Sequence, residues 1–339
     1  MGDRLLTIEN LKISFDTSSG TARVVDGVNL YVDRGEVVTL VGETGCGKSI
    51  LLKSILRLLP TPPAIIQGYI LFEGVNLLSL DDSRFLMYRG NKISYIPQSP
   101  QESLVPVFTV REQFVDLLLF RGMKRVSRLT YYRIRSNKRK VAEVTEQIIK
   151  LLRDVRISDE NLVLDYYPFQ LSGGMAQRVL IAMALSGNPS LILADEPTTA
   201  LDVTIQKQIT DMINDLRNKY KLSILYVTHN LGLAKEISDR VYIMYAGKIV
   251  ENGVSTNIFD NPLHPYTKGL LSSVPKLSGE KFHGIDGTIP SYVVPPSGCR
   301  FHPRCPIAVK ACSEKAPPMK EIEKNHFVSC YAYGGDESG

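Results

Sequence analysis

The sequence lacks several features that would place it in common protein classes. No apolar run approaches the roughly 18 residues that a membrane-spanning helix needs. The start, MGDRLLTIENL, lacks the charged-then-apolar layout of a secretory signal. There is no internal repeat, and the G-x-S-x-G elbow of Ser/His/Asp hydrolases does not occur. The formal net charge of +5 is too mild to indicate nucleic-acid binding by itself. We therefore expect a globular protein of the cytoplasm.

The residues that are present predict one large domain with a smaller addition. The chain has 339 residues, of which 44% are hydrophobic and 22% charged, so it can bury a full core. Apolar alternation indicates strands within residues 5–42, ending in VVTLV, a run typical of a strand buried on both faces. Helical spacing follows at 48–59, 109–121 and 139–155, and short apolar strands are predicted at 191–194 and 223–228. This alternation predicts an α/β fold with a parallel sheet.

Residues 42–49 read GETGCGKS and match the phosphate-loop pattern G-x-x-x-x-G-K-[ST]. They follow a predicted buried strand and open a predicted helix, which is the context that this pattern requires. Backbone N–H groups of such a loop turn toward phosphate oxygens, and the helix dipole adds to the attraction. Lys48 would reach the β- and γ-phosphates, and Ser49 would bind Mg²⁺. The loop predicts a nucleoside triphosphate site.

The apolar strand LILA is followed by two carboxylates, Asp195 and Glu196. Such a strand would deliver Asp195 to the Mg²⁺, while Glu196 would orient or deprotonate an attacking water. His229 ends the next predicted strand. The three side chains indicate hydrolysis of the bound nucleotide.

LSGGM at 171–175 lies between the phosphate loop and this strand, and it resembles the signature of ABC-transporter ATPases. Gln98 in YIPQSP resembles the Q-loop glutamine, 199–202 resembles the D-loop, and His229 resembles the switch histidine. Phe15 stands where the family stacks an aromatic ring on adenine. The resemblance implies an α/β P-loop NTPase core with an N-terminal antiparallel β subdomain. It also implies an inserted α-helical subdomain at about 99–180.

The family works as head-to-tail dimers that hold two ATP molecules at their interface. The resemblance makes Glu196 the general base, His229 a γ-phosphate contact, and Gln98 the link between Mg²⁺ and a transmembrane partner. The signature residues, which would bind the partner subunit's ATP, are Ser172, Gly173, Gly174 and Met175. The expected ATP-binding residues are Phe15, Gly42, Glu43, Thr44, Gly45, Cys46, Gly47, Lys48, Ser49 and Ile50. The expected Mg²⁺ ligands are Ser49, Gln98 and Asp195, the catalytic residues are Lys48, Gln98, Glu196 and His229, and the D-loop aspartate is Asp202.

Two segments near the C-terminus resemble the extension of dipeptide and oligopeptide importer ATPases. They are HPYTKGLL at 264–271 and GCRFHPRCPIAVKAC at 298–312, with Cys330 beyond. The resemblance divides the chain into a nucleotide-binding domain, 1–254, and a small cysteine-containing extension, 255–339.

The same resemblance implies an ATPase subunit that is peripheral to the cytoplasmic face of the cell membrane. Its expected partners are two permeases, a second related ATPase and a solute-binding protein, with no nucleic acid. A homodimer remains an alternative to that heterodimer. The expected cargo is a di- or oligopeptide, with oligosaccharides or nickel as alternatives. One cassette and no heptad run disfavour a soluble ABC ATPase that acts on ribosomes or DNA.

Four cysteines of the extension, with spacing C-x₅-C-x₆-C-x₁₇-C, are candidates for a metal centre: Cys299, Cys305, Cys312 and Cys330. Disulfides are disfavoured in the cytoplasm, and structural zinc usually uses a close C-x₂₋₄-C pair. Together with the resemblance, this spacing favours a [4Fe-4S] cluster, with zinc or free thiols as alternatives. His302 and His326 are alternative ligands, although we expect both to be exposed loop residues.

Two further features carry separate expectations. Cys46 lies at a position where the phosphate-loop pattern tolerates any residue, so the simplest interpretation gives it no specific role. The alternative is that N–H groups and Lys48 lower the pKa of its thiol. Residues 121–140 hold nine Lys and Arg and no acid. A solvated face is the simplest interpretation of this basic stretch, and contact with anionic lipid or with an acidic permease loop is the alternative.

Overall fold

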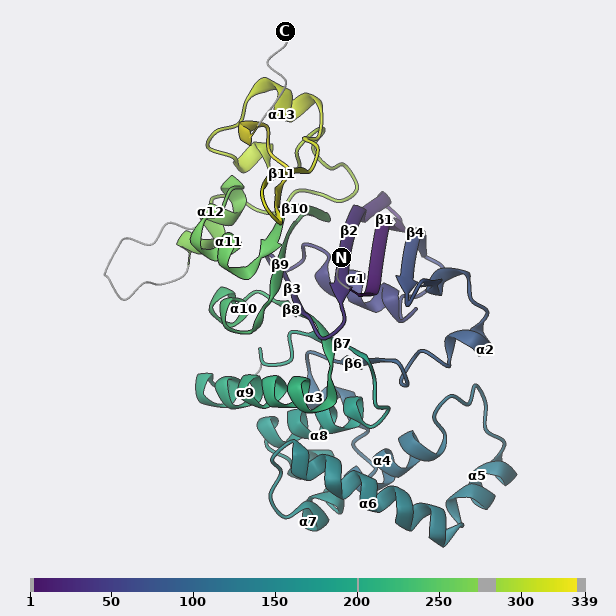
Figure 1. Cartoon of the computed structure of the whole chain (residues 1–339). Helices are drawn as coiled ribbons and strands as arrows, with labels where there is room; N and C mark the ends of the chain where they lie inside the picture. The colour runs from purple at the N-terminus through teal and green to yellow at the C-terminus, as the bar shows by residue number, and fades with distance from the viewer. Residues whose placement is uncertain (1–2, 200, 274–284, 334–339) are drawn as a thin grey trace. The chain divides into compact units, whose positions relative to one another are not determined.

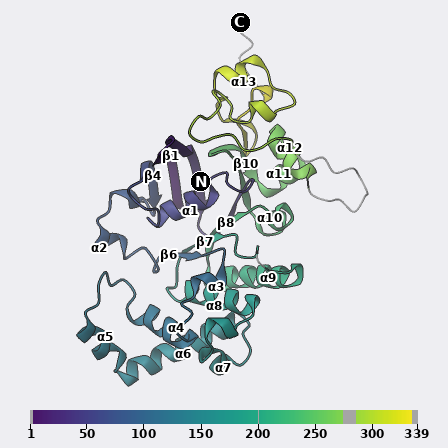
Figure 2. The same cartoon turned by 180° about the vertical axis from the view of Figure 1, so that it is seen from behind.

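The computed structural model describes residues 3–199, 201–273 and 285–333. The chain divides into two compact units, one formed by residues 1–78 and 225–339 and the other by residues 79–224. Figures 1 and 2 show the elements of both units from opposite sides. Among the described residues, no helix has the length and apolar character needed to cross a membrane.

The first unit begins with an antiparallel sheet, whose strands β1, β2 and β4 run side by side in Figure 1. Its strands are β1 (Arg4–Thr17), β2 (Gly20–Asp33), β4 (Ala64–Phe72) and β5 (Val75–Asn76), in the order β2-β1-β4-β5. On β1 the apolar side chains Leu6 and Ile8 are buried, and after a shift of register Leu11 and Ile13 are buried as well. The sheet confirms the expected N-terminal β subdomain.

A second sheet in this unit mixes parallel and antiparallel pairs. Its strands follow the order β11 (Lys320–Glu323), β12 (His326–Val328), β10 (Lys248–Val254), β9 (Arg240–Tyr245), β3 (Val37–Val41) and the end of β8 (Ser223–Thr228). β3 is parallel to β9, whereas β10 is antiparallel to both β9 and β12. All residues of β3 are buried, as its apolar run predicts. Because β12 pairs with β10, the C-terminal extension continues the sheet that carries the phosphate loop.

The helices of the first unit are α1 (Lys48–Ile55), α10 (Leu231–Ile237), α11 (Ser255–Asp260), α12 (Pro265–Ser272) and α13 (Lys310–Glu314). α1 is shorter than the predicted 48–59 because a left-handed residue, Arg57 with φ of 51°, ends it. The N–H groups of Arg57 and Leu58 bond to the carbonyls of Ser54 and Lys53. This pattern is a Schellman motif, which satisfies carbonyls that the helix end leaves free.

The second unit combines a parallel strand pair with helices. The strands β6 (Ile93–Ile96) and β7 (Leu191–Asp195) pair in parallel. The helices are α2 (Asp82–Phe85), α3 (Pro100–Ser103), α4 (Val110–Leu119), α5 (Arg128–Arg135), α6 (Lys138–Asp154), α7 (Glu160–Leu164), α8 (Gly173–Leu185) and α9 (Val203–Tyr220). α4 begins at a capping box in which Thr109 and Glu112 bond to each other's backbone N–H groups. On α6 the predicted apolar stripe buries Ile148 and Leu152.

The basic stretch 121–140 includes α5, on which no residue is buried. Part of its charge is paired inside this unit, with Lys124 bonded to Asp82 and Arg135 to Asp116. Leu129 on the same helix is 84% exposed. These contacts agree with a partly paired, solvated face.

Candidate active site

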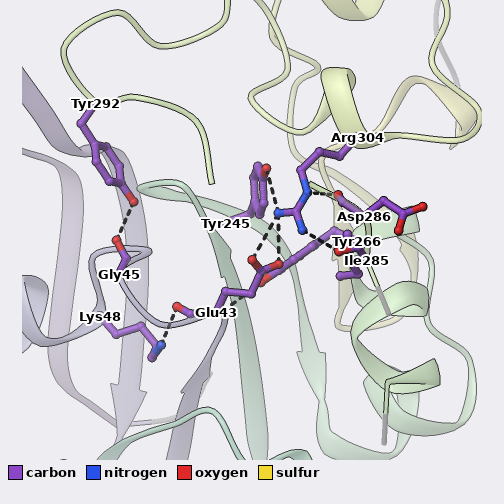
Figure 3. Close-up of polar contacts among 9 residues, drawn as sticks. All are labelled: Glu43, Gly45, Lys48, Tyr245, Tyr266, Ile285, Asp286, Tyr292 and Arg304. Carbon is purple, nitrogen blue, oxygen red and sulfur yellow. Dashed lines mark hydrogen bonds and ion pairs between the residues drawn. The ribbon is translucent and has the colours of Figure 1, made fainter. Parts of the chain in front are cut away.

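The phosphate loop lies between β3 and α1 in the first unit. The side chain of Lys48 is only 4% exposed, and its ammonium donates to the carbonyls of Gly42 and Glu43 at 2.7 and 2.9 Å. Figure 3 shows this lysine beside the loop. A Cβ on Gly42 would lie 2.2 Å from the carbonyl oxygen of Met244, so a larger residue does not fit there. Gly47 has φ of 109°, a conformation that side chains disfavour.

The pKa of the Cys46 thiol is raised, not lowered. The residue is fully buried, and its Sγ lies 3.8 Å from the ammonium of Lys48. Burial nevertheless raises the pKa of the Cys46 thiol, because desolvation of the thiolate outweighs the attraction of the lysine. The alternative of a lowered pKa was therefore wrong, and Cys46 is a packed thiol rather than a reactive one.

Two other predicted site residues belong to the same unit. Phe15 lies partly buried on β1, between Ala22 of β2 and Ala64 of β4. His229 is exposed directly after β8, and the next residue, Asn230, caps α10 by accepting the N–H of Leu233. The adenine and γ-phosphate contacts expected of Phe15 and His229 stay predictions.

In the second unit, the predicted Mg²⁺ ligand Asp195 and the predicted general base Glu196 lie at and just beyond the end of β7. Glu196 is 8% exposed, and its Oε2 accepts bonds from Gln98 Nε2 at 3.3 Å and from Thr199 Oγ1 at 3.0 Å. Its φ of 47° is a strained conformation for a residue with a side chain, and such strain concentrates at functional positions. The structure thus brings Gln98 and Glu196 together.

Tyr95 is a residue of this carboxylate site that sequence reasoning missed. Its hydroxyl donates to Asp195 Oδ2 at 2.8 Å, and Asp195 is 2% exposed. Burial, together with the charge of Asp195, raises the pKa of Tyr95, so the phenol stays protonated and donating. The available signal was its position in YIPQSP, three residues before Gln98.

Replacing Tyr95 with Phe is expected to lower the free energy of unfolding by about 1–2 kcal/mol, because a buried carboxylate loses a hydrogen bond. Urea denaturation of the two proteins measures the difference. Tyr132→Phe is the matched control, since Tyr132 is 69% exposed in the same unit. Equal losses in both variants would show that the bond to Asp195 contributes nothing specific.

One residue of the signature and one of the D-loop are helix caps in the second unit. Ser172 is exposed and caps α8, where its Oγ accepts the N–H of Met175 at 3.3 Å. Gly173 and Gly174 form the first turn of that helix. Asp202 caps α9 by accepting the N–H of Ile205 at 3.0 Å. Ala200, part of the expected D-loop, lies outside the described residues.

The HPY segment is organised by one buried carboxylate, Glu251 of β10. Its two oxygens accept the N–H groups of Leu263 and His264 at 2.8 Å each, and Oε1 also bonds to His326 Nε2 at 2.8 Å. Burial lowers the pKa of His264 to about 4, so this ring is neutral, and its Nδ1 accepts the N–H of Tyr266. His326 is fully buried, so its expected exposure was wrong, because β12 carries it into the sheet opposite Gly253.

The four cysteines of the extension line one cavity of about 210 Å³. They are Cys299, Cys305, Cys312 and Cys330, and none of the four forms a disulfide. Backbone N–H groups two residues further on bond to three of the sulfurs: Phe301 to Cys299, Ile307 to Cys305 and Ala332 to Cys330. His302 also lines the cavity, with Nδ1 bonded to the carbonyl of Cys299 at 2.9 Å.

Burial keeps three of these thiols protonated. It raises the pKa of Cys299 to about 11 and also raises the pKa values of Cys305 and Cys330. A positively charged centre in the cavity would displace these protons, since thiolates are the metal ligands. Within the described ranges, no three His, Cys, Asp or Glu side chains have the arrangement that a single metal ion needs.

Comparison with known families agrees with this geometry. Residues 25–199 match the family described as ABC transporter. The chain belongs to this family. As an ABC ATPase, it hydrolyses ATP in a reaction coupled to transport across a membrane, with ATP and Mg²⁺ as its expected ligands. Residues 250–312 match a second family, described as oligopeptide/dipeptide transporter, C-terminal region.

Relatives of this ABC ATPase align along nearly the whole chain. A probable peptide ABC transporter ATP-binding protein of Sinorhizobium fredii is 43% identical over 97% of this chain and 95% of its own length. The oligopeptide transport ATP-binding protein AppD of Bacillus subtilis is 42% identical over 97% of both chains. Among solved structures, a dimeric bacterial ABC transporter cassette is 27% identical, with a TM-score of 0.61 over 74% of this chain and 98% of its own. A post-hydrolysis dimer bound to ADP and phosphate has a TM-score of 0.60 at 26% identity, again over 74% and 98%.

Proposed function

We propose that this chain is the ATP-hydrolysing subunit of an importer that takes up di- or oligopeptides. The observation that carries the proposal is the HPY segment, which is built into the nucleotide-binding unit through Glu251. The proposal is further supported by full-length relatives whose names describe peptide transport. ATP hydrolysis by this subunit would reset a permease that ATP-driven closure of the dimer has switched.

We further propose the residue roles expected from the sequence. The N–H groups of 42–49 and the ammonium of Lys48 bind the phosphates, while Ser49, Gln98 and Asp195 hold Mg²⁺, which supplies charge neutralisation at the phosphates. Glu196 accepts a proton from the attacking water, and His229 contacts the γ-phosphate. The bonds of Lys48 to the loop carbonyls support its role, since they hold one positive charge at the loop.

Each ATP site of the proposed dimer needs residues from both subunits. The exposed cap Ser172 and the start of α8 present N–H groups at a helix N-terminus, which suits the γ-phosphate of a partner's ATP. We propose a heterodimer with a related ATPase, together with two permeases and a solute-binding protein, at the cytoplasmic face of the membrane. In this proposal residues 1–254 bind nucleotide, and residues 255–339 form the extension.

The cysteine cavity supports a [4Fe-4S] cluster as a part of the proposal. Four thiols around one cavity, with N–H groups aimed at three sulfurs, match the ligand number and the hydrogen bonding of such clusters. The cavity is also far larger than the ~10–15 Å³ that one water-sized group occupies. The cluster would cross-link the loops that carry the four cysteines.

The proposal predicts which proteins accompany the chain in a membrane. ATP-trapped Glu196→Gln protein, isolated from detergent-solubilised membranes of the source cell, is expected to carry two polytopic permeases, a sister ATPase and a solute-binding protein. Mass spectrometry identifies them, and Lys48→Ala protein, which should not hold ATP, is the control. Ligand screening of that binding protein then distinguishes peptides from oligosaccharides or nickel. Ribosomal or DNA-associated proteins without a permease would refute the importer.

A further inference from the structure

Residues beyond β10 hold three polar groups of the phosphate loop, as Figure 3 shows. The hydroxyl of Tyr266 accepts the backbone N–H of Glu43 at 2.9 Å. The hydroxyl of Tyr292 donates to the carbonyl of Gly45 at 2.7 Å. Arg304 Nη1 lies 3.2 Å from each carboxylate oxygen of Glu43. The extension thus fixes the loop at two positions close to where phosphates would bind.

The guanidinium of Arg304 is itself held before it meets Glu43. Its Nε donates to the carbonyl of Asp286 at 2.7 Å, and its Nη2 donates to the carbonyl of Ile285 at 3.1 Å. The hydroxyl of Tyr245 lies 3.3 Å from Nη1. The arginine side chain is 7% exposed and that of Glu43 is 27% exposed. An ion pair that is this rigid and this shielded loses little to side-chain entropy or to salt.

Glu43 needs such a partner because of where it stands. It is the one carboxylate within the loop sequence GETGCGKS, and an uncompensated negative charge there would repel a triphosphate. Arg304 neutralises that charge, so Lys48 is not needed as the partner of Glu43. The lysine can therefore turn from the loop carbonyls to a ligand. The arginine therefore serves the nucleotide in two ways, by fixing the loop and by neutralising its acid.

Arg304 also connects the loop to the cysteine cavity. It directly precedes Cys305, whose thiol lines that cavity. Phe301, another lining residue, packs edge-on against Tyr245 and at a tilt against Tyr266, with ring centroids 5.0 and 5.4 Å apart. If the segment that carries Arg304 and Cys305 became less ordered, the guanidinium would move away from Glu43.

We propose that Arg304 is a positioning residue for the nucleotide, and that it makes nucleotide affinity depend on the cysteine-bearing segment that carries it. The inference rests on the proposed role of residues 42–49 in ATP binding. It goes beyond that role by assigning control of the site to a side chain 261 positions away from Glu43. The extension would then act directly on the nucleotide site, in addition to any role in binding the permeases or the second ATPase.

The test compares ATP dissociation constants in two backgrounds by calorimetry on the purified full chain. Arg304→Gln is expected to raise the Kd for ATP about tenfold, the effect of losing one charge-assisted contact. In a Glu43→Gln background, the same substitution is expected to change Kd less than about twofold, because no charge is left to neutralise. Arg304→Lys should retain most of the affinity, since it keeps the charge.

A matched control separates positioning from simple loss of structure. Arg300 is another buried arginine of the segment and bonds to Asp26, not to residues 42–49, so Arg300→Gln lowers stability with a smaller rise in Kd. If Arg304→Gln lowered the affinity for ATP equally in both backgrounds, Arg304 would have only a structural role and the inference would be overturned. An unchanged Kd would do the same. Failure of the unaltered protein to bind ATP would instead refute the proposed function itself.

Discussion

Glu196→Gln is expected to lower ATP turnover on the order of 10²–10⁴-fold while ATP still binds, which is the usual contribution of a general base. The amide keeps the shape of the side chain and can still bond to Gln98 and Thr199, but it cannot accept a proton from water. Burial of Glu196 at 8% exposure and its strained backbone are consistent with a group kept in one orientation. Phosphate release under single-turnover conditions measures the chemical step, and calorimetry measures ATP affinity.

The control for this variant removes a carboxylate that has no part in the site. Asp211→Asn on α9 breaks only a surface pair with Lys207, whose two side chains are about half exposed. That pair is worth about 0.3–0.5 kcal/mol, so turnover should hardly change. Normal turnover by Glu196→Gln would remove Glu196 from the base role. If Glu196→Gln weakened ATP binding as much as it lowered turnover, Glu196 would have a structural role and not a catalytic one.

The sequence predicts those elements whose pattern and boundaries are local. The strand at 223–228 and the helix at 138–154 appear almost where the sequence puts them, because an apolar pattern marks each segment and Asn137 caps the start of the helix. The end of α1 was misplaced, since the apolar pattern continues while a left-handed residue, Arg57, stops the helix. A left-handed arginine leaves no signal in the sequence.

The errors at the candidate site come from contacts between distant residues. The pKa of Cys46 depends on how deeply the loop is buried, and His326 is buried because β12 pairs with β10 across more than 70 positions. Tyr95 and Arg304 were missed for the same reason. Each residue bonds to a carboxylate that lies 100 or more positions away in the sequence, and neither residue lies in the phosphate loop.

Cys305→Ser is expected to abolish the metal centre almost completely. The unaltered chain, purified without oxygen, should contain about four iron atoms per chain and be brown, as a [4Fe-4S] cluster requires. A serine hydroxyl is a poor ligand for iron in such a cluster, and the N–H of Ile307 would lose the sulfur that it now bonds. Iron analysis and the visible absorbance measure the loss, and limited proteolysis reports whether the extension becomes less ordered.

Cys46→Ser provides the matched control, because it makes the same substitution in the phosphate loop, outside the cysteine cavity. That variant should keep its iron and its colour. Full iron content in Cys305→Ser would exclude this residue as a ligand, and zinc in place of iron in the unaltered protein would refute the cluster. Loss of the centre should also weaken ATP binding through Arg304, the neighbour of Cys305. The two experiments therefore connect: iron-free Cys305→Ser in the Glu43→Gln background should bind ATP better than iron-free Cys305→Ser alone.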